Sequence, residues 1–341
     1  MIRQFAALFK ARTMEFVRDR GTFFWNLLFP VFLVLGFAFA FSGGDERLFK
    51  VGVVGPVDPG LKLTGMEQVQ VVPYDDEVTA RQKLERHQID FLVNSVDSTF
   101  AINKESSKGR FVRDLFMAQQ SASLAGGGNT TRAYSESFVT GKATRYVDWI
   151  VPGVIGMNMM FSSLFGVGYV IVRYRKNGVL KRFKATPVGA LNFVSAQAAS
   201  RLVIVLLTSI FVFAGTNLFL HFMMRGSYLD LLIVTTLGIL CMISIGLVFA
   251  SRMRSEELAG GVLNLITFPM LALSGVFFSL EGSPQILRTI SRGFPLTHFI
   301  EAARKIMLDG ATLLQVMPNL LVLGGLTVAF LLLSSALFKW E

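Results

Sequence analysis

A short basic segment, residues 173–187, contains the residues of this 341-residue chain whose types and spacing point most clearly to a chemical role. It has no acidic residue and six basic ones: Arg173, Arg175, Lys176, Lys181, Arg182 and Lys184. An apolar stretch long enough to cross a bilayer lies on each side. Because Lys and Arg next to membrane spans are retained on the cytoplasmic side, the segment is predicted to be a cytoplasmic loop of a membrane protein. The chemistry open to it is electrostatic attraction, either to a soluble partner or to lipid headgroups.

A short helix with one apolar side chain is predicted inside this segment. Asn177-Gly178 is a turn signal, and residues 178–184 are expected to form a helix that Thr186-Pro187 ends. Phe183 would then be a lone apolar knob among basic side chains. Such a knob can seat in a groove of a soluble partner while its neighbours orient it. The residues alone leave open the alternative that all six charges serve only topology and lipid headgroups.

Motifs for nucleotide binding and for covalent or metal catalysis are absent from the sequence. It contains no G-x-x-x-x-G-K-[ST] phosphate loop, no G-x-S-x-G and no H-E-x-x-H. Three scattered histidines predict no metal site, and the single cysteine, Cys241, allows no intrachain disulfide. The interiors of the apolar stretches lack acidic residues, whereas an ion-coupled carrier would usually show an ionisable group there. A self-sufficient secondary carrier is therefore disfavoured, and energy is expected to arrive from a partner through the cytoplasmic surface.

The composition places the chain among membrane proteins. Hydrophobic residues make up 52% of it and charged residues only 16%, against about 25% in soluble domains. The net charge is +10, but residues 43–148 hold 13 basic and 14 acidic side chains. The excess positive charge therefore lies in the short loops that flank the apolar stretches. It reports membrane topology, and no nucleic-acid partner is predicted.

The N-terminal region is expected to comprise a surface helix and a first span. In residues 1–22 apolar side chains alternate with basic ones, which is typical of an amphipathic helix lying in the cytoplasmic interface. Residues 23–42 follow as the first transmembrane helix. The alternative is a secretory signal peptide cleaved after Ala38-Phe39-Ala40. Against it, the charged region is long and the apolar run 23–41 has 19 residues, more than a signal peptide usually has.

Residues 43–148 are predicted to form a separate external α/β domain. Strands are expected at 50–54, 69–72, 91–93 and 99–103, with a helix from Asp75 to about His87 between the second and third. A further helix is indicated by the apolar face Phe111, Val112, Leu115 and Phe116. The βαβ order favours a small α/β domain.

Five more apolar stretches complete a predicted all-α polytopic membrane protein with six transmembrane helices and both termini in the cytoplasm. They span 149–172, 202–220, 229–250, 258–280 and 320–338, each with at least 19 residues, where a helix needs about 20 to cross the hydrocarbon core. Residues 173–201 and 251–257 would be cytoplasmic, and 221–228 and 281–319 external. The loop 281–319 is expected to hold two short helices, the second ended by Gly310. Whether these helices re-enter the membrane or lie on its surface is left open.

From Trp149 onwards the chain resembles ABC-2 type exporter permeases, the membrane subunits of ATP-binding-cassette transporters. Three stretches carry the resemblance: 146–153, which looks like the start of the second span; 175–188, which looks like the coupling segment; and 294–310, which looks like the outer loop before the last span. The insert, including 50–54 and 87–93, is similar to that of the subgroup with a large external domain between spans one and two.

The resemblance implies two permease copies, as a homodimer or with a homologous permease, bound to two ATP-binding subunits. ATP and Mg would be held by those subunits, with no cofactor on this chain. The coupling segment, 173–190, would supply the contact residues Gly178, Leu180, Lys181, Arg182, Phe183, Lys184, Thr186 and Pro187. Residues 1–22 would form a connecting helix beside it, with Arg12, Glu15 and Arg18 as its candidate site residues. The path between the copies would be lined by spans two and five, with Met157, Met159, Met160 and Phe161 as candidates; ordinary packing or lipid contact is the alternative.

The expected function is export of an amphipathic, drug-like or lipid-like substrate by alternating access, in the inner membrane of a bacterium. Membrane lipids and a periplasmic adaptor are further candidate partners. The alternative is a mechanical signalling component, in which ATPase work moves the external domain and no substrate crosses. Transport of a labelled lipid or drug by the reconstituted complex would separate the two.

Overall fold

The structure is a computed structural model that describes residues 2–40, 49–56, 66, 68–85, 87–125, 134–141, 145–186, 189–253, 255–278 and 284–337. The chain divides into two compact units. The helical unit comprises Met1–Phe41 and Tyr146–Glu341, and the α/β unit comprises Ser42–Arg145. Each unit is described separately because each has its own core.

The α/β unit is built on a five-stranded sheet of order β2-β1-β3-β4-β5. Its strands are β1 Phe49–Val54, β2 Val69–Tyr74, β3 Phe91–Asn94, β4 Thr99–Asn103 and β5 Ser135–Val139. Strand β1 pairs in parallel with β2 and β3, and β4 is antiparallel to β3 but parallel to β5. The four predicted strands are thus confirmed. Strand β5 is missing from the prediction because it is an edge strand with one buried residue, Val139, and so lacks an apolar pattern.

Two helices cover opposite faces of this sheet. Helix α3, Glu77–Glu85, buries Ala80 and Leu84 against one face, and helix α4, Ser107–Ala125, buries Val112 and Phe116 against the other. Side chains alternate between faces along a strand, so β3 is buried on both sides. Asp76 begins α3 by accepting hydrogen bonds from the N–H groups of Val78 and Thr79, both at 3.2 Å, and these bonds lower the pKa of its carboxyl.

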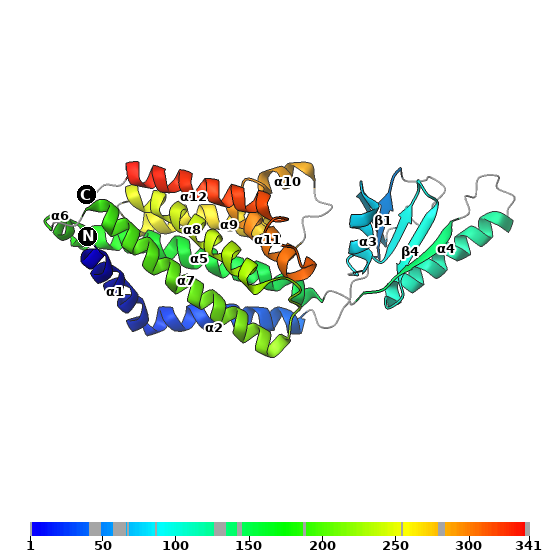
Figure 1. Cartoon of the computed structure of the whole chain (residues 1–341), viewed down its shortest axis with the longest axis horizontal. Coiled ribbons are helices and arrows are strands. Elements are labelled where there is room, and N and C mark those ends of the chain that lie inside the picture. Colours follow the sequence, from blue (N-terminus) through cyan, green and yellow to red (C-terminus); the bar gives the residue numbers. More distant parts are fainter. Residues whose placement is uncertain are drawn as a thin grey trace. The chain divides into compact units, whose positions relative to one another are not determined.

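The helical unit contains ten helices among the described residues (Figure 1). They are α1 Ile2–Arg18, α2 Arg20–Ala40, α5 Tyr146–Lys176, α6 Val179–Lys184, α7 Ala190–Leu220, α8 Tyr228–Arg252, α9 Glu256–Leu273, α10 Gln285–Ser291, α11 Pro295–Asp309 and α12 Met317–Leu337. Five of them, α5, α7, α8, α9 and α12, are long and apolar enough to cross a membrane. The chain is therefore a polytopic membrane protein. In α2 the described apolar stretch Asn26–Phe37 is shorter, so a sixth span stays a prediction.

One predicted loop is mostly helical, and one predicted span boundary is wrong. The apolar run 202–220 lies within helix α7, which begins twelve residues earlier at Ala190, so most of the predicted loop 173–201 is helical. The early part of α7 is amphipathic, with Phe193, Ala196 and Ser200 buried at helical spacing, and its polar face hides it from a hydropathy criterion. Helix α9 ends at Leu273 rather than at 280, because Gly275 turns the chain with a φ of 72°.

The two short helices predicted between spans five and six are confirmed as α10 and α11. The expected apolar face of α11 is buried: Phe299, Ala302, Ala303 and Ile306. Gly310 ends α11 with a φ of 69°. Helix α11 packs against α5, α8 and α12, so it belongs to the core of the helical unit.

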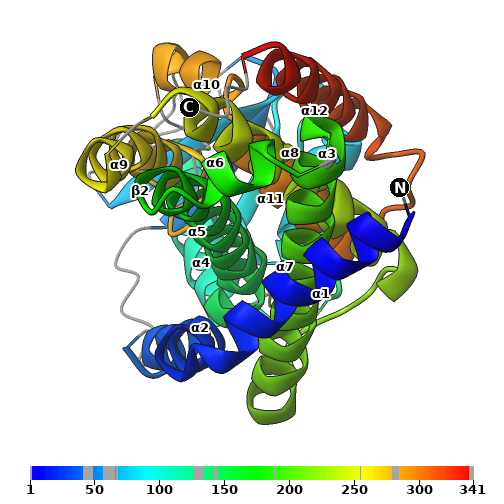
Figure 2. The same ribbon diagram turned by 90° about the vertical axis from the view of Figure 1, so that its left-hand side faces the viewer.

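Helices α1 and α6 lie at one end of the helical unit, and α10 and α11 lie at the other (Figure 1). The C-terminal end of α2 and the N-terminal end of α5 also lie at the α10 and α11 end of the helical unit. Seen from the α6 end, α1 crosses α7 and continues towards α2 (Figure 2). The end that carries α1 and α6 is called the α6 end of the helical unit throughout.

The separate core of the α/β unit predicts a local response to a core mutation. Phe116 is buried, with ring centroids 5.2 Å from Phe91 and 5.1 Å from Phe100. We expect Phe116→Ala to destabilise the α/β unit by about 3–5 kcal/mol, the usual cost of removing a core phenylalanine. Limited proteolysis of the purified chain should show new cleavage within 42–145 and an unchanged helical unit. The matched change Phe138→Ala, at an exposed ring on β5, should leave the pattern unchanged; equal cleavage in both variants would contradict the prediction.

Candidate coupling surface

Helix α6 presents a basic face at the α6 end of the helical unit. Gly178 begins it with a φ of 69°, a left-handed conformation that turns the chain sharply out of α5. Leu180 is fully buried, whereas Lys181, Arg182 and Lys184 are exposed. After the helix, the Thr186 hydroxyl donates to the Phe183 carbonyl at 2.7 Å. The short helix predicted at 178–184 is confirmed, and its outward side carries positive charge. Pro187 lies outside the described residues.

Phe183 does not project alone, and that part of the expectation is wrong. The ring is half-buried, and its centroid lies 5.4 Å from that of Phe193 in α7. Phe193 is itself fully buried and also lies near Tyr174 of α5. Leu180 and Phe183 are three residues apart, so both point from α6 towards the helical core. The exposed surface of α6 is therefore basic, and the Phe183 ring packs beneath it against Phe193 of α7.

Helix α1, the predicted connecting helix, is tied to α5 by a chain of polar contacts. Arg12 is buried, donates to the Gly166 carbonyl of α5 at 3.2 Å, and pairs with Glu15 at 2.9 Å. Glu15 in turn accepts a hydrogen bond from the Tyr174 hydroxyl of α5. Of the predicted connecting-helix residues, the structure therefore brings Arg12 and Glu15 together. Arg18 is exposed near the end of α1 and does not join this group among the described contacts.

A second arginine, Arg201 of α7, lies between α1 and α5. It is only 5% exposed, and both its Nε, at 2.7 Å, and its Nη2 donate to the Ser162 carbonyl of α5. Its guanidinium also lies over the Phe16 ring of α1. One turn along α5, the absence of a side chain at Gly166 makes room for it, since a Cβ there would overlap the guanidinium. No ion pair between Arg201 and an acidic side chain occurs in the part of the chain that the structure describes.

Arg175 ties the end of α5 to the end of α8. Its guanidinium donates to the carbonyls of Ala250 at 3.0 Å and Ser251 at 3.1 Å, and also to that of Met253. These are carbonyls that a helix leaves without partners at its C-terminus, where a cation is also favoured by the helix dipole. Arg175 precedes α6 by only a few residues. The end of α5 from which α6 starts is therefore held against α1 and α8, and α6 itself packs on α7 through Phe183.

Sequence reasoning assigned none of these roles to Arg175, Arg201, Ser162 or Tyr174. Their partners lie 39 to 159 residues away along the chain, so no local spacing links them. One signal was available: Arg201 directly precedes an apolar run, and a cation at that position needs a specific partner.

The candidate path residues divide into two groups. Met157, Met159 and Met160 are buried within the helical unit, and their role in lining a path stays a prediction. Phe161 is only half-buried and begins an aromatic ladder on α5, with ring centroids 5.7 Å from Phe161 to Phe165 and 5.5 Å on to Tyr169. The Tyr169 hydroxyl lies close to Gly260 of α9. The repeat of four residues would have revealed this ladder in the sequence.

Known proteins are similar to this chain over most of its length. A family model described as ABC-2 family transporter protein matches residues 20–336. Curated relatives include the inner membrane transport permease YhhJ of Escherichia coli K12, 24% identical over 183 residues, which are 53% of this chain and 49% of the relative. The probable multidrug ABC transporter permease YbhS of the same organism is 22% identical over 184 residues, 54% and 49% of the two chains. The daunorubicin resistance ABC transporter permease protein DrrB1 of Streptomyces coeruleorubidus is 24% identical over 200 residues, 57% and 69%. The chain thus spans about half the length of the first two relatives.

Because Arg201 lies so close to Gly166, we expect an added methyl group at position 166 to lower stability more than one added at an open glycine position. Gly166→Ala should displace the guanidinium and destabilise the chain by about 1–3 kcal/mol, as overpacking usually does. Gly261→Ala in α9, where a Cβ would meet open space, should be neutral or stabilise by up to about 1 kcal/mol. Thermal unfolding in detergent measures both. Equal unfolding temperatures for the two variants would refute the contact.

The hydrogen bonds from Arg175 to the last carbonyls of α8 predict a local effect on hydrogen exchange at the end of α8. In Arg175→Lys the planar, forked guanidinium is replaced by a compact ammonium on a flexible stem, which does not match the positions of the three carbonyls. A hydrogen bond to a charged group contributes about 1.5–3 kcal/mol, so amides at the end of α8 should exchange at least about tenfold faster. Arg173→Lys, at an exposed neighbour on the same helix, is the control and should change nothing. The role of these hydrogen bonds would be disproved by unchanged exchange in Arg175→Lys.

Proposed function

Because this chain belongs to the ABC-2 family of transporter proteins, we propose that it works as the permease of an ATP-binding-cassette exporter powered by a separate ATPase. The observation that carries the proposal is the basic face of α6, anchored by Leu180 and Phe183 and joined to the membrane helices through Arg175. The sequence has no phosphate loop, so ATP and Mg would be bound by the partner. Two permease copies would bind two ATPase subunits.

The basic face would dock in an acidic groove of the ATPase. Lys181 and Arg182 would attract and orient the partner, because complementary charge sets the encounter rate and the register of an interface. Closure of the ATPases on ATP would push α6. The contacts at its base would pass this displacement to α1, α7 and α8 together, and a rigid-body movement of that kind is a common mode of alternating access.

The topology follows from where the positive charge lies. The α6 end of the helical unit would face the cytoplasm, since it carries the dense group of Lys and Arg. Helix α2 would be the sixth span, which puts both termini on the same side as α6. The α/β unit, inserted between α2 and α5, would then be external, where a periplasmic adaptor could reach it. A bacterial inner membrane is the proposed location.

The cargo we propose is amphipathic, drug-like or lipid-like. Two of the relatives are named for multidrug transport and for daunorubicin resistance. In this chain the aromatic ladder of Phe161, Phe165 and Tyr169 offers an uncharged, adaptable surface next to α9. The path would run between two copies, with α5 and α9 of each as its walls.

Charge reversal on α6 tests the proposal. Both Lys181 and Arg182 are exposed, so Lys181→Glu combined with Arg182→Glu should leave the chain folded. Like charges across an interface repel, so co-purification with the ATPase of the same gene cluster should fall at least about tenfold, and substrate-stimulated ATP hydrolysis with it. Replacing Phe183 would be a less selective test, since its ring also packs on Phe193.

The matched control makes the same change of charge at the opposite end of the helical unit. Arg288→Glu combined with Arg292→Glu, at exposed side chains on and after α10, should keep ATPase binding and hydrolysis at the wild-type level. Wild-type ATPase binding by the α6 double variant would reject α6 as the coupling element. So would an equal loss in the control.

A further inference from the structure

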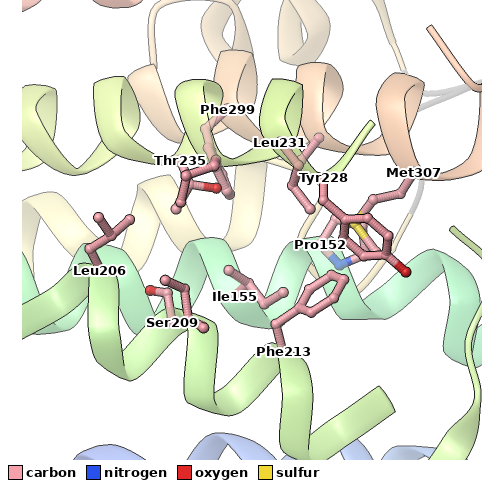
Figure 3. A pocket seen from close by; sticks show the side chains of 13 residues that line it. Pro152, Ile155, Leu206, Ser209, Phe213, Tyr228, Leu231, Thr235, Phe299 and Met307 are labelled. Atoms are coloured by element: carbon pink, nitrogen blue, oxygen red, sulfur yellow. The ribbon is translucent and has the colours of Figure 1, made fainter. Parts of the chain in front are cut away.

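An apolar pocket of about 240 Å³ lies within the helical unit (Figure 3). Thirteen residues of α5, α7, α8 and α11 line it, and neither α6 nor α9 contributes. It is therefore separate from the basic face and from the aromatic ladder beside α9. None of the thirteen carries a charge, and their only side-chain oxygens are the hydroxyls of Ser209, Tyr228 and Thr235. A charged or strongly polar molecule would lose its hydration there without compensation.

The pocket has a buried floor and a mouth on the apolar surface. Phe299, Ala303 and Met307 of α11 form part of the floor and are fully buried. Ile210 of α7 and Leu232 of α8 lie at the mouth and are exposed. The mouth continues into other exposed apolar side chains of these two helices: Leu207, Phe211 and Ile233. Since α7 and α8 are both long and apolar enough to cross a membrane, this surface would face lipid chains.

The pocket is elongated along the helix axes. Its lining residues on α7 lie between Leu206 and Phe213, and those on α8 between Tyr228 and Thr235, a stretch of eight residues in each case. That span corresponds to about 10 Å of helix, against about 15 Å for half of the hydrocarbon core of a bilayer. The volume is below the roughly 300–1,000 Å³ of sites for drug-sized ligands. The dimensions suit one hydrocarbon chain lying across a single leaflet.

One end of the pocket is suited to a phospholipid headgroup. Figure 3 shows Leu206 towards one end and Tyr228 and Met307 towards the other. At the second end Arg225 donates its backbone N–H to the Met307 carbonyl at 2.9 Å, so the backbone of this exposed, basic residue lies next to the pocket lining. Tyr228 is exposed there as well, and tyrosine favours the membrane interface. A guanidinium is a good partner for a phosphate.

We propose that this pocket binds one acyl chain of an anionic membrane phospholipid, with the lipid phosphate at Arg225. The occupant is a lipid of the bilayer and not the exported cargo. The acyl chain would lie between α5, α7, α8 and α11, the four helices that line the pocket. Lipid occupancy does not depend on α6 being the coupling element, so the two proposals can fail separately.

Photolabelling of the full chain tests this site. The purified protein is reconstituted in vesicles of phosphatidylethanolamine and phosphatidylglycerol that contain a trace of phosphatidylglycerol with a diazirine on one acyl chain. After illumination, mass spectrometry should find the label concentrated on peptides that contain 206–213 and 228–235. An even spread of label that reaches the exposed residues Leu218, Leu265 and Leu321, which lie outside these two peptides, would overturn the proposal.

A larger side chain at position 209 would fill the pocket with little other disturbance. The Ser209 hydroxyl has no hydrogen-bond partner among the described residues, so Ser209→Leu breaks no hydrogen bond while adding volume at the lining. Labelling of the pocket peptides should fall about tenfold, which corresponds to about 1.4 kcal/mol. Ser209→Ala keeps the pocket open and should label as the wild type does. If Ser209→Leu does not fold, Ala303→Leu fills the same pocket from α11. Wild-type labelling in a folded, filled variant would refute the site.

The headgroup and the source of the chain are tested in the same vesicles. Arg225→Gln should abolish the preference for labelled phosphatidylglycerol over labelled phosphatidylcholine; an unchanged preference would remove Arg225 from the site. A soluble single-chain amphiphile, added in excess, should not displace the phospholipid label. Its displacement of the label would show that the pocket holds cargo and would overturn the assignment to a bilayer lipid.

Discussion

The α6 end of the helical unit depends on two arginine side chains buried against the backbone of α5. Arg12 comes from α1 and Arg201 from α7, and each guanidinium reaches a carbonyl of the same stretch of α5, at Gly166 and at Ser162. A buried guanidinium that loses its partner costs several kcal/mol. Helices α1, α5 and α7 therefore cannot slide past one another without breaking these contacts, and they form a stiff base for whatever is attached to them.

Helix α6 is attached to that base by its own apolar side chains and through the preceding turn of α5. Leu180 and Phe183 fix it to the core, Phe183 through the buried ring of Phe193 in α7, and Arg175 fixes the preceding turn of α5 to the end of α8. A short helix has little stability of its own, so these contacts decide its orientation. Its basic side chains then face outward on a rigid support. An element that passes on a movement of an ATPase needs such a rigid support, because a flexible loop with the same charges would change shape instead of transmitting the movement.

Sequence patterns predicted the helices and strands better than the contacts between them. Alternation and capping identified four strands and both helices of the α/β unit, and Asn177-Gly178 identified the turn before α6. They failed where burial came from tertiary packing: for the edge strand β5, for the amphipathic start of α7 and for Phe183, whose ring meets a partner ten residues further on. The pairing of Arg201 with Ser162 depends on a gap left by Gly166, and nothing local to either residue indicates it.

The central claim is that the ATPase meets the outward side of α6. It is tested most directly by placing a photo-crosslinking amino acid at Arg182 in the assembled complex and, in a second variant, at Arg288 on α10. The account predicts a crosslink from position 182 to the ATPase that depends on complex formation, and none from position 288. An assembled, ATP-hydrolysing complex that gives no crosslink from 182, or equal crosslinking from 288, would contradict it.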